Sequence, residues 1–161
     1  MSIRSTYFFG FIIICGLLLT SLYLQFFEGI IPCPLCTLQR LSFGLLGILF
    51  LFGTLLHSKR FGRLLINFLS ILTSLLGIGL AVRQIWLQHF AANGSSECGV
   101  SLQYMIQVLP LNEVLQKIFA GSAECTQRGW EFLSFNMAEW ALIWFTLFLI
   151  MTAYLLVKGK K

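Results

Sequence analysis

The chain has 161 residues, of which 58% are hydrophobic and only 11% are charged, and its formal net charge is +5. A soluble domain usually carries about a quarter charged residues, so this composition excludes an ordinary soluble protein and indicates a membrane protein. A helix that crosses a bilayer needs about 20 consecutive apolar residues. The sequence therefore predicts an all-α protein whose apolar segments cross a membrane.

Four segments are long and apolar enough, or nearly so, to cross the bilayer as helices. They cover residues 7–27, 35–56, 64–87 and 140–157. Because they use about half of the chain, they leave no room for a separate soluble domain. We predict a single integral-membrane domain over residues 1–161, a four-transmembrane-helix bundle with outward loops at about 28–34 and 89–138.

The first segment shares one feature with a cleaved signal peptide, because Arg4 precedes it. It is longer than the apolar region of a usual signal peptide, which has about 7–15 residues. The stretch LQFFEG at its far end also lacks the small-x-small cleavage pattern. We therefore expect a retained helix, with Cys15 buried inside it as a small apolar residue.

Charged residues are divided unequally between the two ends of this predicted bundle. The tails and the connection at 57–63 contain no acid and carry Arg4, Lys59, Arg60, Arg63, Lys158, Lys160 and Lys161. The other two connections and their flanks contain Glu28, Glu97, Glu113, Glu124, Glu131 and Glu139. Since basic loops mark the cytoplasmic side, we expect a multi-pass membrane protein with both termini in the cytoplasm and both outward loops on the opposite side.

A Cys-Pro-Leu-Cys motif opens the second segment. Pro34 suits the first helical turn, because its missing N–H costs nothing there and its φ is already helical. Cys33 is then near the N-cap and Cys36 is in the first turn, where unpaired N–H groups and the helix dipole favour a thiolate. The thiolate is the reactive form of cysteine, so this pattern predicts a reactive pair.

Three residues near the outer ends of the segments each allow two interpretations. Arg40 follows Cys36 by four residues, so the two side chains share one helix face. An arginine there could stabilise a thiolate or bind an oxygen of an apolar molecule dissolved in the membrane. Alternatively, it extends to the lipid headgroups. Arg83 and Trp86 in the third segment are likewise either pocket residues or contacts with the headgroups.

The long outward loop contains a second cysteine pair, Cys98 and Cys125, in the oxidising compartment. Cys98 follows the polar stretch AANGSSE, which we expect to be exposed. Apolar residues at helical spacing over 111–119 predict a short helix that lies on the membrane surface or packs on the protein. The pair either exchanges disulfides with a second protein or forms a structural disulfide worth about 3 kcal/mol.

A zinc site is the alternative chemistry for four outward cysteines. Cys98 and Cys125 do not have the short spacing that is typical of zinc ligands. The two histidines do not help, because His57 is on the cytoplasmic side and His89 stands alone. We therefore expect no metal ligands among these residues.

These motifs together resemble the DsbB family of bacterial inner-membrane disulfide-forming oxidases. The resemblance is carried by CPLCTLQR at 33–40, RQIWLQ at 83–88, ECGVSLQYM at 97–105 and GSAECTQRGWEFL at 121–133. It runs over nearly the whole chain. It implies four transmembrane helices, with one cysteine pair at the outer start of the second helix and another in the last periplasmic loop.

The resemblance also implies a role for each cysteine. Cys98 would form a mixed disulfide with a thioredoxin-like periplasmic protein of the DsbA type, and Cys125 would complete that pair. Cys33 would receive electrons from the loop pair, and Cys36 would face a membrane quinone, either ubiquinone or menaquinone. Arg40 would hold a quinone oxygen.

Arg83 and Trp86 are the other residues that we place around the quinone pocket. The chain departs from the family's pattern beside them, because many relatives read Arg-His where this sequence has Arg83 and Gln84. A second departure is SFNMAEW at 134–140, where the family often reads Gly-Leu-x-Met-Pro-x-Trp, and it could change how the chain re-enters the membrane. Neither departure changes a cysteine.

We therefore predict a quinone-dependent protein-disulfide oxidoreductase that reoxidises a periplasmic dithiol protein and passes the electrons to the membrane quinone pool. No nucleic-acid partner is expected. A close variant serves one dedicated partner instead of many. The alternative function is a membrane protein whose outward cysteines bind metal or form structural disulfides in the loops, without redox turnover. A vitamin-K-epoxide-reductase-like protein fits less well. Such a protein has its Cys-x-x-Cys near the end of the bundle, whereas this chain has the motif ahead of the second helix.

Overall fold

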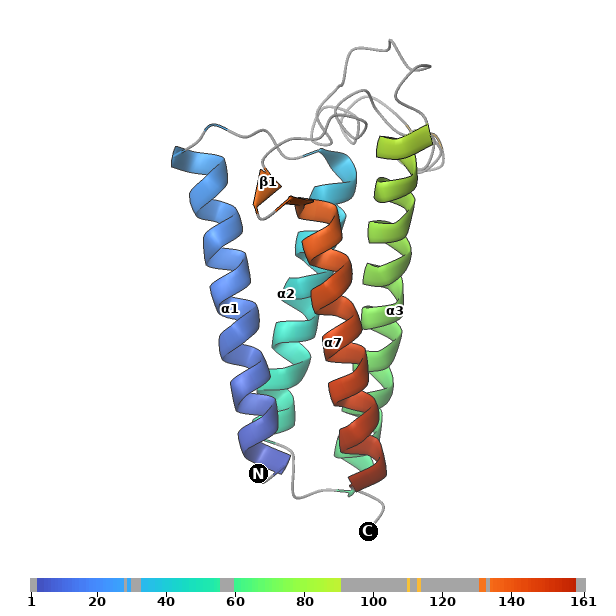
Figure 1. Ribbon diagram of the computed structural model, residues 1–161. Coiled ribbons are helices and arrows are strands. Elements are labelled where there is room, and N and C mark those ends of the chain that lie inside the picture. The colour runs from blue at the N-terminus through green and yellow to red at the C-terminus, as the bar shows by residue number, and fades with distance from the viewer. Residues whose placement is uncertain are drawn as a thin grey trace.

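The computed structural model describes residues 3–27, 29, 33–55, 60–90, 110, 113, 131–132 and 134–158. Its long helices are α1 (Ile3–Phe27), α2 (Pro34–Leu55), α3 (Arg60–Phe90) and α7 (Met137–Lys158). They form a bundle with the N-terminus and the C-terminus at the same end (Figure 1). Each of these four helices is long and apolar enough to cross a membrane. The predicted all-α, four-helix membrane bundle is confirmed.

The helices extend beyond the apolar segments that were predicted from the sequence. α3 runs from Arg60 to Phe90 rather than over 64–87, and α7 starts at Met137 rather than at 140. A helix satisfies its own backbone hydrogen bonds, so it can continue through polar residues beyond the apolar core of the bilayer. The predicted short helix over 111–119 lies outside the described residues, apart from Glu113.

One face of α3 consists of small and polar residues that repeat every three or four positions, the spacing that keeps side chains on one side of a helix. Its buried members are Asn67, Ser70, Ser74, Gly77, Ala81, Gln84 and Gln88. Small side chains allow neighbouring helices to approach closely, which is a main route to helix association in a bilayer. With this face, α3 packs between α2 and α7.

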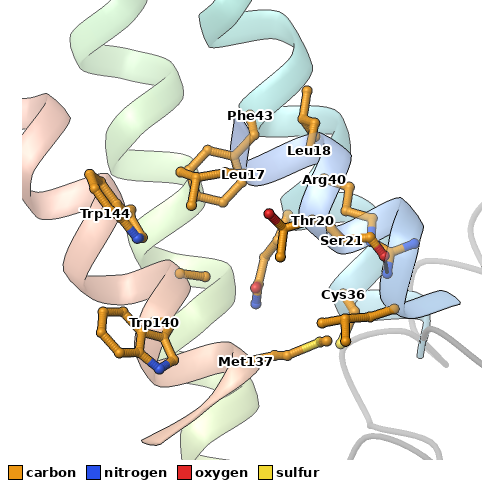
Figure 2. Close-up of a pocket in the computed structure, with 13 residues that line it drawn as sticks. Leu17, Leu18, Thr20, Ser21, Cys36, Arg40, Phe43, Met137, Trp140 and Trp144 are labelled. Atoms are coloured by element: carbon orange, nitrogen blue, oxygen red, sulfur yellow. Dashed lines mark hydrogen bonds between the residues drawn. The ribbon is translucent and has the colours of Figure 1, made fainter. Parts of the chain in front are cut away.

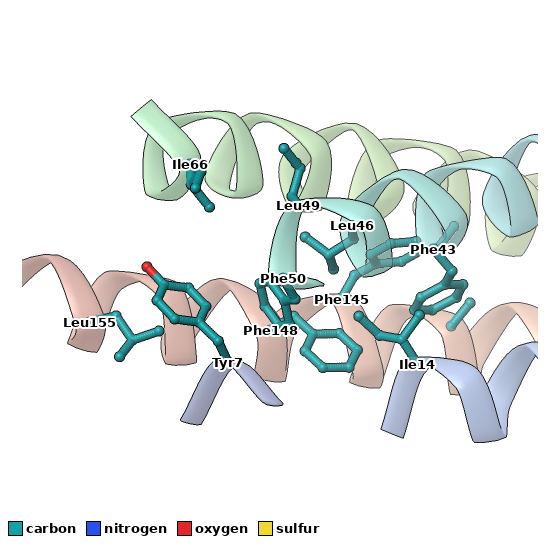
Figure 3. Close-up of a cluster of buried hydrophobic side chains, with 12 residues drawn as sticks. Tyr7, Ile14, Phe43, Leu46, Leu49, Phe50, Ile66, Phe145, Phe148 and Leu155 are labelled. Carbon is teal, nitrogen blue, oxygen red and sulfur yellow. The ribbon is translucent and has the colours of Figure 1, made fainter. Parts of the chain in front are cut away.

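The core of the bundle combines aromatic and aliphatic side chains (Figure 3). Phe43 of α2 and Phe145 of α7 are stacked with their ring centroids 3.9 Å apart, and Phe148 meets Phe43 edge-on at 6.4 Å. Tyr7 adds a polar contact, because its hydroxyl donates to Oδ1 of Asn67 at 2.7 Å and so ties α1 to α3. Lipid offers no hydrogen bonds, so such a partner stabilises a buried hydroxyl. The buried hydroxyls of Ser70 and Ser74 on α3 have no hydrogen-bond partner among the described residues.

A short hairpin leads into α7. β1 (Glu131–Phe132) pairs antiparallel with β2 (Phe135–Asn136), and Ser134 in the turn has a φ of 67°. Asn136 then caps α7: its Oδ1 accepts from the N–H of Glu139 at 3.0 Å, and the Glu139 carboxylate accepts from the N–H of Asn136 at 2.8 Å. This reciprocal arrangement is a capping box. It explains why α7 begins ahead of its apolar run.

The substitution Gly77→Ala is expected to destabilise the bundle. A Cβ at Gly77 would overlap ring atoms of Phe145, so α3 and α7 would have to move apart. Gly79 on the same helix is the matched control, because a Cβ there meets nothing within 4 Å. Both changes gain about 1 kcal/mol of helix propensity, so only the contact distinguishes them. Thermal unfolding in detergent should give a lower midpoint for G77A than for G79A, and equal midpoints would contradict the close approach.

Asn136→Ala is expected to lower the stability more than Asn136→Ser does. Alanine removes the cap of α7, which costs about 0.5–2 kcal/mol. It also removes the hydrogen bond from Asn136 Nδ2 to Gln88 Oε1, which is 2.8 Å long. Serine loses that second bond but restores a capping oxygen. Chemical unfolding of both variants in the same detergent measures the difference, and equal losses would mean that the cap does not stabilise the start of α7.

Candidate functional site

Cys33 and Cys36 lie at the start of α2, as predicted, and the Cys33 side chain caps the helix. The Sγ of Cys33 accepts a hydrogen bond from the backbone N–H of Cys36 at 3.2 Å, and its carbonyl accepts from the N–H of Thr37 at 3.0 Å. Pro34 occupies the first helical position, where no N–H is needed. The motif therefore folds locally so that the positive end of the helix dipole lies at the sulfurs.

The two sulfurs form a dithiol, 2.8 Å apart. The surroundings of the two thiols differ. Cys33 is only 4% exposed, whereas Cys36 is half-buried and lines a cavity. Of the two, Cys36 is therefore the one placed to meet a molecule in that cavity.

The cavity beside Cys36 has a volume of about 420 Å³ and lies among α1, α2 and α7 (Figure 2). Small-molecule sites usually have volumes of about 300–1,000 Å³. Most of its wall is apolar and consists of Leu17, Leu18, Leu24, Phe43, Met137, Trp140, Ala141 and Trp144. The polar part of the wall consists of Thr20, Ser21, Cys36, Gln39 and Arg40. This lining suits an apolar ring that carries a few polar atoms.

The structure brings Arg40 and Cys36 together on the wall of this one cavity. The guanidinium of Arg40 is held by α1, because Nη2 donates to the carbonyl of Ser21 at 3.2 Å and Nη1 donates to Oε1 of Gln25. The side chain is half-buried and therefore does not simply extend to the headgroups. A guanidinium has five N–H donors, so the group can hold its α1 partners and also donate to a ligand oxygen.

Two buried glutamines also reach the site, and neither was predicted as a site residue. Nε2 of Gln84 donates to Sγ of Cys36 at 3.1 Å, and Nε2 of Gln39 donates to Oε1 of Gln84 at 2.9 Å. Gln84 belongs to the small and polar face of α3, and the repeat of that face is a sequence signal that indicates a position inside the bundle. Gln39 precedes Arg40 directly in the chain, and no signal of its own distinguished it.

Arg83 and Trp86, which we placed around the pocket from the sequence, do not line this cavity. The guanidinium carbon of Arg83 is 4.6 Å from the centroid of the Trp86 ring, and Trp86 is 47% exposed and stacks on Phe90. Successive residues of a helix are turned by about 100°. Because Gln84 faces the bundle, Trp86 faces away from it. Arg83 and Trp86 form a cation–π pair on that outer side instead of lining the cavity.

Cys15 is the one further cysteine among the described residues. Cys98 and Cys125, the predicted loop pair, lie outside the described residues. Cys15 on α1 is half-buried rather than buried as predicted, because α1 covers the bundle with only one of its faces. Within the described ranges, no group of three or more His, Cys, Asp or Glu residues could hold a metal ion.

The fold and the site define a multi-pass membrane protein with a dithiol at the start of one helix, beside an apolar cavity within the bundle. The family model described as Disulfide bond formation protein DsbB matches residues 3–155. The chain therefore belongs to the DsbB family of membrane disulfide bond formation proteins.

Several proteins named Disulfide bond formation protein B are similar to this chain over almost its whole length. The one from Hahella chejuensis is 38% identical over 158 residues, which cover 98% of this chain and 96% of that protein. The one from Methylobacillus flagellatus is 36% identical and covers 94% and 93%, respectively. The one from Marinobacter nauticus is 34% identical and covers 96% and 93%. The family resemblance inferred from the cysteine motifs is confirmed.

Proposed function

We propose that this protein generates disulfides by reoxidising a periplasmic, thioredoxin-like dithiol protein of the DsbA type and passing the electrons to a membrane quinone. The observation that carries the proposal is the position of Cys36. Its sulfur lines an apolar cavity beside Arg40, and Cys36 is in the first turn of α2, where the positive end of the helix dipole favours a thiolate. A lipid-soluble electron acceptor suits such a cavity, because it partitions into the bilayer that surrounds the bundle.

The lining of the cavity fits a quinone, which supplies a two-electron, two-proton acceptor when it is bound. Phe43, Trp140 and Trp144 offer aromatic surfaces against which a flat ring can stack. Arg40 offers a charge-assisted hydrogen bond to an oxygen that gains negative charge. Ubiquinone and menaquinone both present this chemistry, so both are candidates.

Electrons move between the cysteine pairs by thiol–disulfide exchange. The two thiols of the partner become a disulfide as the Cys98–Cys125 disulfide is reduced, and the loop dithiol is reoxidised as the Cys33–Cys36 disulfide is reduced. Each exchange forms one S–S bond, breaks another and transfers two electrons. When the Cys33–Cys36 disulfide forms again, two electrons leave through Cys36 and two protons leave the thiols, which balances the reduction of one quinone to one quinol.

We place both termini in the cytoplasm and the cysteines on the periplasmic side of a bacterial inner membrane. Both chain ends lie at one end of the bundle, where α3 begins at Arg60 and α7 ends at Lys158 (Figure 1). The opposite end carries the start of α2 with Cys33. Basic residues favour the cytoplasmic side, and disulfides persist in the periplasm, so the charges and the cysteines support the same orientation.

Anaerobic titration with a reduced thioredoxin-like dithiol protein and either quinone is expected to reduce one quinone for each partner disulfide formed. Quinone absorbance and alkylation of the partner's thiols measure the two sides of this balance. Cys36→Ser should abolish quinone reduction because it removes the sulfur from the cavity wall. Cys15→Ser is the matched control, since Cys15 does not line the cavity. Full turnover in C36S, or inert cysteines with both quinones, would contradict the proposal.

Arg40→Ala is expected to raise the KM for quinone about 10–100-fold, because a hydrogen bond to a charged group contributes about 1.5–3 kcal/mol. Arg40→Lys keeps the charge but loses the planar fork, so it should recover only part of the affinity. Arg83→Ala is the control, because this cation does not line the cavity. Steady-state rates at varied quinone concentration measure the effect. An equal rise in KM for R83A and R40A would contradict quinone binding in this cavity.

A further inference from the structure

Cys36 has a polar neighbour that the electron path described above does not use. Nε2 of Gln84 lies 3.1 Å from Sγ of Cys36, and the Gln84 side chain is only 3% exposed. Gln84 belongs to α3, whereas the described residues that line the cavity come from α1, α2 and α7. The amide therefore reaches the sulfur from the body of the bundle and leaves the cavity side of Cys36 open to a bound acceptor.

A second amide stabilises the orientation of the first. Nε2 of Gln39 donates to Oε1 of Gln84 at 2.9 Å, and Gln39 is itself only 5% exposed. With its oxygen engaged in this way, Gln84 presents an N–H and not a carbonyl to the sulfur. If the Gln84 amide turned over alone, its NH₂ group would face the NH₂ group of Gln39 and both hydrogen bonds would be lost. The two amides thus form a chain of two hydrogen bonds, called the relay below, that runs from Gln39 on α2 through Gln84 on α3 to Cys36 on α2.

Because Gln84 donates to the sulfur, this hydrogen bond is stronger for one redox form of Cys36 than for the other. A thiolate accepts an N–H hydrogen bond strongly, because hydrogen bonds to ionised groups are about twice as strong as neutral ones. The sulfur of a disulfide carries no charge and accepts such a bond only weakly. A donor held at 3.1 Å from Sγ therefore stabilises the reduced form of the pair relative to its disulfide.

We propose that Gln84, oriented by Gln39, is a positioning residue that stabilises the Cys36 thiolate and makes the Cys33–Cys36 disulfide a stronger oxidant. The proposal rests on the proposed function for its biological meaning. In the exchange it favours, an attacking thiolate forms an S–S bond with Cys33 and the Cys33–Cys36 bond breaks. Cys36 leaves as a thiolate with the electron pair of that bond, and Gln84 donates its N–H to the charge that appears.

The test is the redox equilibrium of the Cys33–Cys36 pair in a graded buffer of reduced and oxidised glutathione, without quinone or partner protein. Alkylation of the reduced thiols followed by mass spectrometry of the peptide that contains Cys33 and Cys36 reports this pair alone. Gln84→Leu is expected to lower the equilibrium constant for reduction about tenfold, which corresponds to about 30 mV. Gln84→His, whose ring N–H can donate to the sulfur, should recover most of the wild-type value.

Gln88→Leu is the matched control, because Gln88 is a buried amide on the same face of α3 that pairs with Asn136 and not with a cysteine. A shift in Q84L without a shift in Q88L supports the proposal, whereas equal values, or equal shifts in both variants, would overturn it. Gln39→Leu leaves Gln84 in place and should lower the equilibrium constant for reduction two- to fivefold. This variant keeps the test decisive if Q84L does not fold. A wild-type value in Q39L would overturn the orienting role of Gln39.

This experiment can fail independently of the proposed function. It uses only glutathione and the protein's own cysteines, so its result stands whether or not quinone is the acceptor. If the wild-type protein reduces quinone with a dithiol partner but Q84L keeps the wild-type redox equilibrium, the role of Gln84 is wrong and the proposed function stands. If the equilibrium shifts but no quinone is reduced, the proposed function is wrong and the relay stands.

Discussion

Inside a bilayer, no water is available to pair with a buried polar group. Apart from the unpaired hydroxyls of Ser70 and Ser74, the described part of the bundle meets this constraint with polar pairs that join α3 to another helix or to the residue just before α7. The pairs are Tyr7 with Asn67, Gln39 with Gln84, and Asn136 with Gln88. Such hydrogen bonds between membrane helices contribute only about 0.6 kcal/mol each on average. Their larger effect here is geometric, because each pair includes a residue of α3 and together they fix its rotation.

The same constraint shapes the site. Polar groups on the cavity wall are few, and the neighbouring helices hold the important ones in place. Arg40 is held by Ser21 and Gln25 of α1, and Gln84 is held by Gln39 of α2. Donors that are already oriented need no reorganisation when charge develops beside them, which is the most effective form of electrostatic stabilisation. The apolar remainder of the wall lowers the local dielectric constant, which strengthens each of these interactions.

Several features of this protein followed from local sequence. The number of membrane helices followed from the lengths of the apolar segments, and the position of Cys33 and Cys36 followed from Pro34 and the motif around it. The helix ends were predicted less well. α7 begins at a capping box formed by Asn136 and Glu139, and this signal depends on hydrogen bonds and not on apolar length. The length of an apolar segment therefore does not indicate where α7 begins.

The four spans and a cysteine pair at the positive end of a helix could be predicted from the sequence alone, because both are properties of short stretches of chain. The identity of the side chains around Cys36 could not be predicted in this way, because it depends on how the helices pack. Arg83, Gln84 and Trp86 are close together in the sequence, yet Gln84 donates to the sulfur whereas Arg83 lies over the Trp86 ring. The reason is the rotation of α3, which depends on packing between distant residues such as Gly77 against Phe145. No local window of sequence contains both partners of such a contact, so the sequence alone could not decide it.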